Sequence, residues 1–374
     1  MDTKITNNEI KQKNRTSIFQ LFRERDQLSR QDIAAALDLS LPTVTQNLQQ
    51  LKAEGLIAET GTIGNTGGRR ARAYSLVKNA RTAIGLDITK DHVTAVALDL
   101  NGSIIATVRR SLTFTRTDDY YRSLGDIVAQ TVRQGRLKGE HILGVGIGVP
   151  GLITRDQKTV FYGAVLGVAD VSCEEFSKYI PYPTMLCHDT NTAGFAEIWN
   201  YPDTPTAFYL MLSASIGGAV YIDGKQYDGL NLRAGEAGHM VIVPGGKRCY
   251  CGNRGCMDAY CAARVLTSAA DGSLERFFRL LKQGDPRIRA VWEEYLEHLV
   301  TAVNNLRMLF DCNIIIGGHT GSFMDEYIDE LRDRLARRNP FEDAADYLMP
   351  CRYKTEAVAT GAALNYISAF LDSI

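Results

Sequence analysis

The sequence predicts an α/β protein whose main body has two related lobes, preceded by a small head of three helices and a hairpin. Three short helical patterns in residues 1–78, followed by two strand-like runs around a Gly-rich turn, indicate the head. A pattern of strands and turns begins near residue 82 and recurs about 120 residues later. This repeat predicts the two related lobes of the body. A chain of 374 residues, 45% apolar and 23% charged, has the length and composition of a soluble globular protein with two or three domains.

The helical patterns of the head have recognisable starts and stops. Between residues 13 and 25 apolar side chains recur at helical spacing. The second helix is predicted to begin after Ser29, with Asp32 three residues on, an arrangement close to a capping box. The third is predicted to begin after Ser40, because Pro42 is tolerated in a first turn, and to stop at Gly55. The head is therefore predicted to hold three consecutive helices.

The third helix, residues 43–54, has two different faces. Val44, Leu48 and Leu51 form an apolar stripe for the core. The other face and its N-terminal end carry uncharged donors and acceptors, namely Ser40, Thr43, Thr45, Gln46, Gln49 and Gln50. Such groups suit the edges of bases, and Gln pairs bidentately with adenine in the major groove. This helix is therefore the candidate recognition helix.

The hairpin that follows has a basic tip, Gly67-Gly68-Arg69-Arg70, with Arg72 just beyond it. A helix-turn-helix followed by a basic hairpin is the arrangement of a winged helix. We expect helix 43–54 to read bases, and Arg69 and Arg70 to contact phosphates or the minor groove. The alternative is a small helical dimerisation domain with a solvated polar face.

Charge is distributed unevenly along the chain. Residues 1–78 hold 12 Lys and Arg against 8 Asp and Glu, whereas the remainder holds 30 against 35. The formal net charge of −1 hides this asymmetry. A basic head on a mildly acidic body is consistent with a head that meets a polyanion.

The body, residues 79–374, contains a repeated design. The stretch from Ala83 to Val108 reads as strand, turn, strand, Asn-Gly turn and strand. The stretch from Ala207 to Gly229 repeats it, with Asp223-Gly224 in place of Asn101-Gly102. We expect two related α/β lobes, at approximately 79–195 and 196–374, facing each other across a cleft where a small ligand can bind.

Three cysteines, Cys249, Cys251 and Cys256, fall within eight positions, ten residues after His239. No apolar run reaches the roughly 18 residues of a membrane span, and the polar N-terminus is not a secretory signal. We therefore expect a reducing cytoplasm, where disulfides are rare. Three thiolates and an imidazole would make a closed tetrahedral zinc set, which would stabilise a Gly-rich loop with little apolar content. Free buried thiols and a site using Cys261 instead of His239 are the alternatives.

Several motifs together resemble the ROK family of repressors, open reading frames and sugar kinases. They are GVGIGVPG, HDTNTAGFAE, SIGGAV, AGEAGH, CYCGNRGC and IIIGGH, in this order over roughly residues 80–370. The resemblance implies a two-lobed actin-like ATPase (ribonuclease H-like) fold and a homodimer or homotetramer. With a winged helix in front, the chain resembles the repressor branch. The histidine-cysteine block matches at all four positions, which favours His239 as the fourth zinc ligand.

The same resemblance implies a sugar site. It places His188, Asp189, Glu236, His239 and Asp258 against the sugar, with the His239 imidazole facing both zinc and sugar. Asp189 stands where the kinases of the family carry their catalytic base. This sequence departs from the kinase pattern at His188, where they usually have Asn, and at Asp258, where they have Glu. The identity of the sugar therefore does not carry over.

The two phosphate turns of the family's kinases are altered here. Their Asp-x-Gly-Gly-Thr turn corresponds to Asp87–Asp91, which lacks both glycines, and their second Gly-rich turn corresponds to Ser213–Gly218, which keeps only the last two. Glycines at such turns let backbone N–H groups approach phosphate. ATP binding is therefore not expected, and Asp189 is predicted to be a hydroxyl acceptor and not a catalyst.

The prediction from sequence is a cytoplasmic, non-enzymatic DNA-binding transcriptional regulator, a repressor that senses a monosaccharide or sugar derivative. Its partners would be operator DNA, the sugar and further copies of itself, with one structural zinc per chain and no membrane. Sugar in the cleft would change the angle between the lobes and so the spacing of the winged helices. The alternatives are an active ATP-dependent sugar kinase and a repressor that responds to a partner protein.

Overall fold

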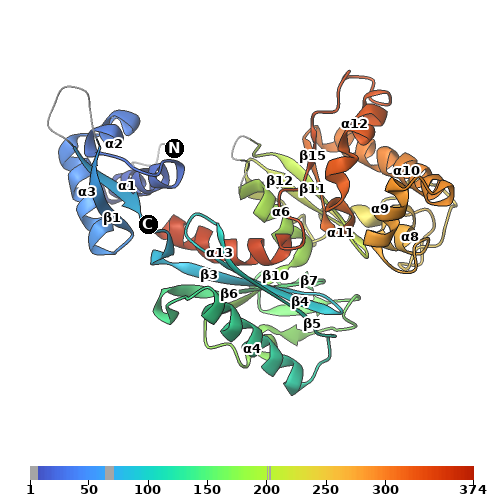
Figure 1. The fold of residues 1–374 in the computed structure, drawn as a ribbon, viewed down its shortest axis with the longest axis horizontal. Coiled ribbons are helices and arrows are strands. Elements are labelled where there is room, and N and C mark those ends of the chain that lie inside the picture. The colour runs from blue at the N-terminus through green and yellow to red at the C-terminus, as the bar shows by residue number, and fades with distance from the viewer. Residues whose placement is uncertain (1–6, 64–70, 200, 202–203) are drawn as a thin grey trace.

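The computed structural model describes residues 7–63, 71–199, 201 and 204–374. Figure 1 shows a helical head at one end and two α/β lobes beyond it, with the C-terminus close to the head. Among the helices in these ranges, none combines the length and apolar character needed to cross a membrane. The predicted α/β class and N-terminal head are confirmed.

The head has the predicted order of elements. Helices α1 (Asn7–Glu24), α2 (Arg30–Leu37) and α3 (Leu41–Ala53) precede the antiparallel strands β1 (Ile57–Ile63) and β2 (Ala71–Leu76). The capping box is present, since the Asp32 amide donates to the Ser29 hydroxyl at 3.2 Å and the Ser29 amide donates to the Asp32 carboxylate at 2.8 Å. The hairpin tip, with Arg69 and Arg70, lies outside the described residues.

The first lobe is built on a five-stranded sheet in the order β10-β6-β3-β4-β5. Strands β3, β4 and β5 are an antiparallel meander, and β6 and β10 run parallel to β3. The bounds are β3 Thr82–Ile88, β4 His92–Leu98, β5 Ile104–Ser111, β6 Ile142–Val149 and β10 Thr184–His188. Helices α4 (Asp118–Gln134) and α5 (Cys173–Ser177) pack here, and β7 (Leu152–Ile153), β8 (Thr159–Tyr162) and β9 (Val171–Ser172) form a small separate sheet.

The second lobe repeats this topology. Its sheet has the order β13-β12-β11-β14-β15, with β11, β12 and β13 antiparallel and β14 and β15 parallel to β11. The bounds are β11 Ala207–Leu212, β12 Ile216–Ile222, β13 Lys225–Gln226, β14 Asn313–Gly317 and β15 Leu348–Pro350. The predicted repeat of the two openings is therefore confirmed at the level of strand order and direction.

Helices cover the second sheet and complete its core. They are α7 (Asp258–Cys261), α8 (Ala263–Thr267), α9 (Leu274–Lys282), α10 (Pro286–Phe310), α11 (Gly318–Gly321) and α12 (Ile328–Ala336). The long helix α10 buries Trp292, Tyr295, Leu299, Val303 and Leu306, an apolar stripe at helical spacing.

The C-terminal helix α13 (Ala357–Ser373) does not belong to the second lobe but packs on strands β3, β4 and β6 of the first. A Cβ at Gly85 or Gly146 would collide with the backbone of α13, so these strand glycines allow its close approach. Helix α6 (Asp189–Trp199) lies between α13 and the second sheet. The lobe boundary expected at residues 195/196 therefore does not hold to the C-terminus, because the chain returns to the first lobe.

Helices α6 and α13 both reach the head. Residues of α1, from Gln12 to Gln20, share a surface hollow with Asp372 of α13. Trp199, at the end of α6, lies under the guanidinium of Arg23 from α1. The apolar core of the head continues into that of the first lobe. The head is thus in contact with the two helices that pass the cleft.

Candidate functional site

The candidate recognition helix α3 presents its amides outward. Gln46, Gln49 and Gln50 are exposed, and Thr45 is half-buried. Ser40 and Thr43, by contrast, are engaged with each other: the Thr43 amide donates to the Ser40 hydroxyl at 3.3 Å, and the two hydroxyls are 2.8 Å apart. Ser40 and Thr43 therefore begin the helix, whereas the three glutamines lie at the surface.

The central cleft between the lobes is a cavity of about 820 Å³. It brings together four of the five residues predicted to bind sugar: His188 and Asp189 from the first lobe, and Glu236 and His239 from the second. Tyr250 joins them at the cleft. These side chains lie close together because β10 ends, α6 begins, and the loop after β13 folds back at the same place.

Asp189 is the first residue of α6, at the end of the buried strand β10. Its Oδ1 accepts hydrogen bonds from the Thr190 amide at 2.6 Å and the Thr190 hydroxyl at 3.2 Å. Nε2 of His188 lies 3.7 Å from the same oxygen. Within the described residues Oδ2 has no such partner, and Asp189 lines both the central cleft and a neighbouring hollow. One oxygen is therefore fixed by the helix start, and the other is available to a ligand.

Glu236 and His239 lie on one short turn of the second lobe. Nε2 of His239 is 4.0 Å from the Glu236 carboxylate and 3.3 Å from the Tyr250 hydroxyl. The Tyr250 ring packs edge-on against the imidazole, with ring centroids 5.3 Å apart. The Nε2 side of the ring therefore faces the polar groups of the cleft.

Asp258 does not line the cleft, although it was predicted to contact the sugar. Its side chain is buried; Oδ1 accepts the Ile216 amide at 2.9 Å, and Oδ2 forms an ion pair with Arg264. The pair holds the start of α7 against the start of β12, so Asp258 supports the glycine turn of the cleft from behind. Both oxygens of the Asp258 carboxylate are therefore engaged with protein groups.

The metal-ligating residues come together as the sequence predicted. Ligand atoms of His239, Cys249, Cys251 and Cys256 all lie within 4.8 Å of one another, and the sulfurs of Cys251 and Cys256 are 3.8 Å apart. Tetrahedral zinc with bonds of about 2.3 Å to sulfur places its sulfurs at about that separation. Nδ1 of His239 is buried without a hydrogen-bond partner among the described residues, as a metal-facing nitrogen would be. This donor set fits zinc, and Cys261, buried elsewhere, is not part of it.

The hollow of about 240 Å³ beside Asp189 corresponds to the phosphate side of the cleft. Its first turn is closed by Thr89, whose hydroxyl donates to the His92 carbonyl and accepts the His92 amide, both at 3.0 Å. In the second turn, Gly217 and Gly218 are required for packing, because a Cβ would collide with Thr190 or Phe208. Packing alone therefore accounts for Gly217 and Gly218, without a bound nucleotide.

Asp87, at the end of β3, lines the same hollow. Burial and, secondarily, the negative charge of Asp189 raise the pKa of Asp87 to about 7. Asp87 therefore keeps its proton to a higher pH than an exposed carboxyl group does.

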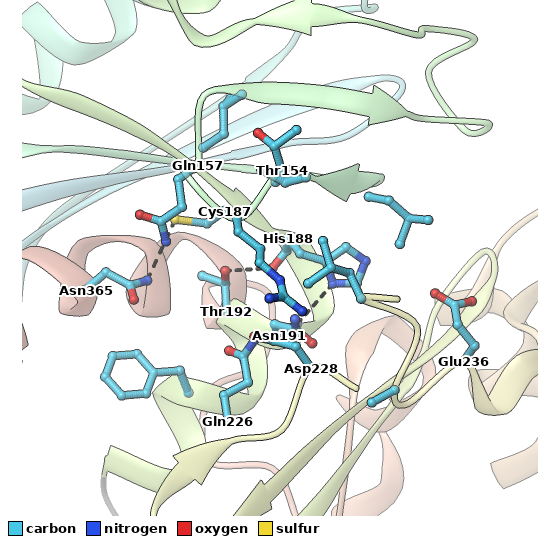
Figure 2. A pocket seen from close by; sticks show the side chains of 17 residues that line it. Thr154, Gln157, Cys187, His188, Asn191, Thr192, Gln226, Asp228, Glu236 and Asn365 are labelled. Carbon is cyan, nitrogen blue, oxygen red and sulfur yellow. Dashed lines mark hydrogen bonds between the residues drawn. The ribbon is translucent and has the colours of Figure 1, made fainter. Parts of the chain in front are cut away.

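A further hollow of about 390 Å³ lies on the other side of His188 (Figure 2). We call it the second cavity. It is bordered by residues 152–157, by α6, by the loop 226–236 and by Asn365 of α13. The second cavity, Tyr250 and Arg264 were not predicted from the sequence. Tyr250 lies inside the cysteine block and could have been noticed there, whereas nothing local marks Arg264. Two segments of the second cavity lie in motifs that had been assigned to the central cleft.

The winged head, the two-lobed body and the polar cleft define a DNA-binding regulator with a small-molecule site. The sequence pattern of the ROK family matches residues 83–367, and that of a helix-turn-helix domain matches residues 12–60. The chain belongs to the ROK family.

Individual relatives match most of this chain. The xylose repressor of Bacillus subtilis is 25% identical over 98% of this chain and 97% of its own length. The DNA-binding transcriptional dual regulator NagC of Escherichia coli is 27% identical over 74% of this chain and 67% of its own length. A crystal structure of a ROK family transcriptional regulator, a homologue of the E. coli MLC protein, superposes with a TM-score of 0.75 at 22% identity, covering 97% of each chain. This last likeness confirms the fold.

Proposed function

We propose that this protein is a sugar-responsive transcriptional repressor of carbohydrate genes that binds operator DNA through its winged helix. The observation that carries the proposal is the cleft of about 820 Å³, which is lined by Glu236, His239 and Asp189. One carboxylate oxygen of Asp189 has no hydrogen-bond partner among the residues that the structure describes. Charged acceptors and an imidazole around a hollow of this size suit a ligand with several hydroxyl groups. The name of the xylose repressor agrees with such a ligand without fixing which sugar binds here.

The path from sugar to DNA runs along α6. Its first residue, Asp189, is at the cleft, and its last, Trp199, touches the head. A sugar that binds Asp189 together with Glu236 and His239 draws the lobes toward each other and tilts α6. A coupling of about 1–3 kcal/mol between sugar and DNA is sufficient for regulation.

In this proposal zinc is structural, bound by His239, Cys249, Cys251 and Cys256. The bound ion would fix the tautomer of His239, so that Nδ1 meets the metal and Nε2 carries the proton toward the cleft. The metal thereby holds a sugar-binding group in position and folds a loop with little apolar content.

The protein is proposed not to be a kinase. Thr89 fills the first phosphate turn with a hydroxyl that is already bonded, and Gly217 and Gly218 are explained by packing. An active sugar kinase is the second candidate, because Asp189 keeps the position of the family's base. An ATP-turnover assay with hexoses and pentoses separates the two, since the repressor proposal expects none.

We further propose a cytoplasmic homo-oligomer. Leu309 and Phe341, on the second lobe, are 72% and 81% exposed, which is unusual for large apolar side chains and suits a face between subunits. Two copies would place two winged helices on a palindromic operator.

The experiment that tests the function is a release titration. Operator DNA, selected from random sequence by the protein itself, is bound first, and free sugars are then added singly. A sugar that releases DNA and raises the melting temperature of the protein supports the proposal. If no sugar releases the operator DNA, but a protein from cells grown on different carbon sources does, the partner-protein alternative is favoured.

A further inference from the structure

The second cavity meets the central cleft at His188 and Glu236, which line both hollows (Figure 2). It lies between the lobes: residues 152–157 and α6 border it on one side, and the loop 226–236 on the other. Its volume of about 390 Å³ is large enough for a further small polar unit. A ligand in the central cleft can therefore continue past these two side chains.

Uncharged polar side chains gather around this cavity. They are Thr154, Gln157, Asn191, Thr192, Gln226 and Asn365. In the described parts of the chain, no hydrogen bond engages the side-chain amide of Gln157 or of Asn191. The side-chain nitrogen of Asn365 donates to the Gly361 carbonyl at 2.9 Å and to the Cys187 sulfur at 3.7 Å, whereas its oxygen accepts no hydrogen bond from the described residues. Amides offer both donors and acceptors, the combination that a hydroxyl group requires.

The charges of the cavity do not favour an ionic ligand. Arg155 is opposed by Asp228 and Glu236, and all three are exposed. The Arg155 guanidinium donates to the Leu230 carbonyl at 3.3 Å, which joins the two lobes beside the cavity. Phe195 adds an aromatic ring to the lining, a surface on which the apolar face of a sugar ring can rest. The lining therefore suits a neutral, hydroxyl-rich unit better than a phosphate.

The backbone supports a functional role. Gln157 and Leu232 both line this cavity and both have a φ of 59°. The left-handed region is sterically unfavourable for a non-glycine residue. Residues held in such conformations cluster at ligand-binding sites, where surrounding contacts maintain them.

We propose that the effector is a carbohydrate of at least two linked sugar residues, with one residue in the central cleft and the next in the second cavity. This inference rests on the proposed function and adds the class of effector to it. The first sugar residue contacts Asp189 and His239, the link passes His188 and Glu236, and the second sugar residue meets the amides of Gln157 and Asn191. Both lobes then hold one extended ligand.

The test compares monosaccharides with their own disaccharides by calorimetry on the full chain: glucose with cellobiose, xylose with xylobiose, and N-acetylglucosamine with its β-1,4-linked dimer. We expect one disaccharide to bind at least about tenfold more tightly than its monosaccharide, at one molecule per chain. Gln157→Ala and Asn191→Ala should each weaken that disaccharide by about three- to tenfold, the effect of one lost hydrogen bond, and leave the monosaccharide unchanged. Gln283→Ala, an exposed amide outside the cavity lining, is the matched control.

Two results would overturn the proposal and leave the proposed function intact. One is equal affinity for monosaccharide and disaccharide, with no effect of either variant. The other is two monosaccharides per chain, which would make the second cavity a separate site. If no sugar of either size binds or releases DNA, the proposed function itself is wrong. Melting temperatures of the unliganded variants, expected to match the wild type, show that the substitutions leave the fold unchanged.

Discussion

The guanidinium carbon of Arg23 lies 4.5 Å from the centroid of the Trp199 ring, and this contact joins the DNA-binding head to the body. Nε of Arg23 is buried and has no hydrogen-bond partner among the described residues. Phe195 packs edge-on against Trp199 at 5.9 Å. Since Phe195 lines the second cavity, a ligand there is two ring contacts away from the head.

Replacing this tryptophan should separate sensing from DNA release. We expect Trp199→Leu to bind sugar and operator DNA with little change, because Trp199 lies at neither surface, but to release DNA poorly when sugar is added. The cation–π contact is worth about 0.5–2 kcal/mol, comparable to the whole coupling. Trp199→Phe keeps an aromatic ring and should retain part of the response. Full release by Trp199→Leu would show that the signal takes another path.

Removal of one thiolate should remove the metal. We expect about one zinc per purified wild-type chain, and none in Cys251→Ser, with a lower melting temperature because metal binding contributes folding free energy. Elemental analysis and thermal melts measure both. Cys261→Ala is the control, since Cys261 lies outside the ligand group and should keep its zinc despite a packing loss. If zinc were retained in His239→Ala but lost in Cys261→Ala, Cys261 and not His239 would be the fourth zinc ligand.

Asp189→Asn should weaken sugar binding while sparing DNA binding. The amide keeps the size of the side chain but replaces a charged acceptor that faces the cleft. Loss of a charge-assisted hydrogen bond costs about 1.5–3 kcal/mol, roughly ten- to a hundredfold in affinity. Calorimetry with the selected sugar and a DNA-release titration check this. If the mutant and the wild type bound the sugar equally well, the role of Asp189 would be limited to the start of α6.

The head should show two kinds of DNA contact. Gln46→Ala should relax preference for the cognate sequence by about 1–3 kcal/mol at one base position. Arg69→Ala combined with Arg70→Ala should weaken binding to all duplexes and reduce its salt dependence. Binding of cognate and random duplexes at several salt concentrations distinguishes them. If Gln46→Ala weakened both duplexes alike, α3 would not read that base.

Asp87 should make the protein less stable as pH rises. Its pKa is raised to about 7 in the folded protein from an ordinary 3.8, so the folded state binds the proton more tightly than the unfolded state does. The associated stabilisation is complete below about pH 4 and is lost as pH rises through about 7. Asp87→Asn should therefore flatten this slope and raise the free energy of unfolding at pH 8 by roughly 2–4 kcal/mol. Denaturant melts at pH 5 and pH 8 test it, and a mutant with an unchanged slope would assign the dependence to other groups.

The local features of this fold could be predicted from sequence because their signals are local. The capping residues Ser29 and Asp32 stand three apart, and the Asn101-Gly102 and Asp223-Gly224 turns stand between strand-like runs. The short spacing of the three cysteines likewise predicts a metal group, whereas the choice of His239 over Cys261 rested on the family resemblance. Each of these features is decided by neighbours within a few residues.

Long-range placement could not be predicted in the same way. Asp258 was expected in the cleft, but its charge is met by Arg264 six residues later, a spacing that no regular helix pattern indicates. The packing of α13 on the first sheet could not be predicted either, because it depends on Gly85 and Gly146, which lie in strands far from α13 in sequence. The second cavity is likewise assembled from four segments that are distant in sequence. Two of them carry motifs, but no local spacing indicates that the four segments meet.

The return of α13 to the first lobe has a consequence for the order of synthesis. All residues of the winged helix have left the ribosome once residue 78 is out, but part of the apolar core that it shares with the first lobe is then still missing. One face of the first lobe's sheet stays uncovered until α13 emerges. A chain interrupted before α13 would therefore leave apolar surface of both the head and this sheet uncovered.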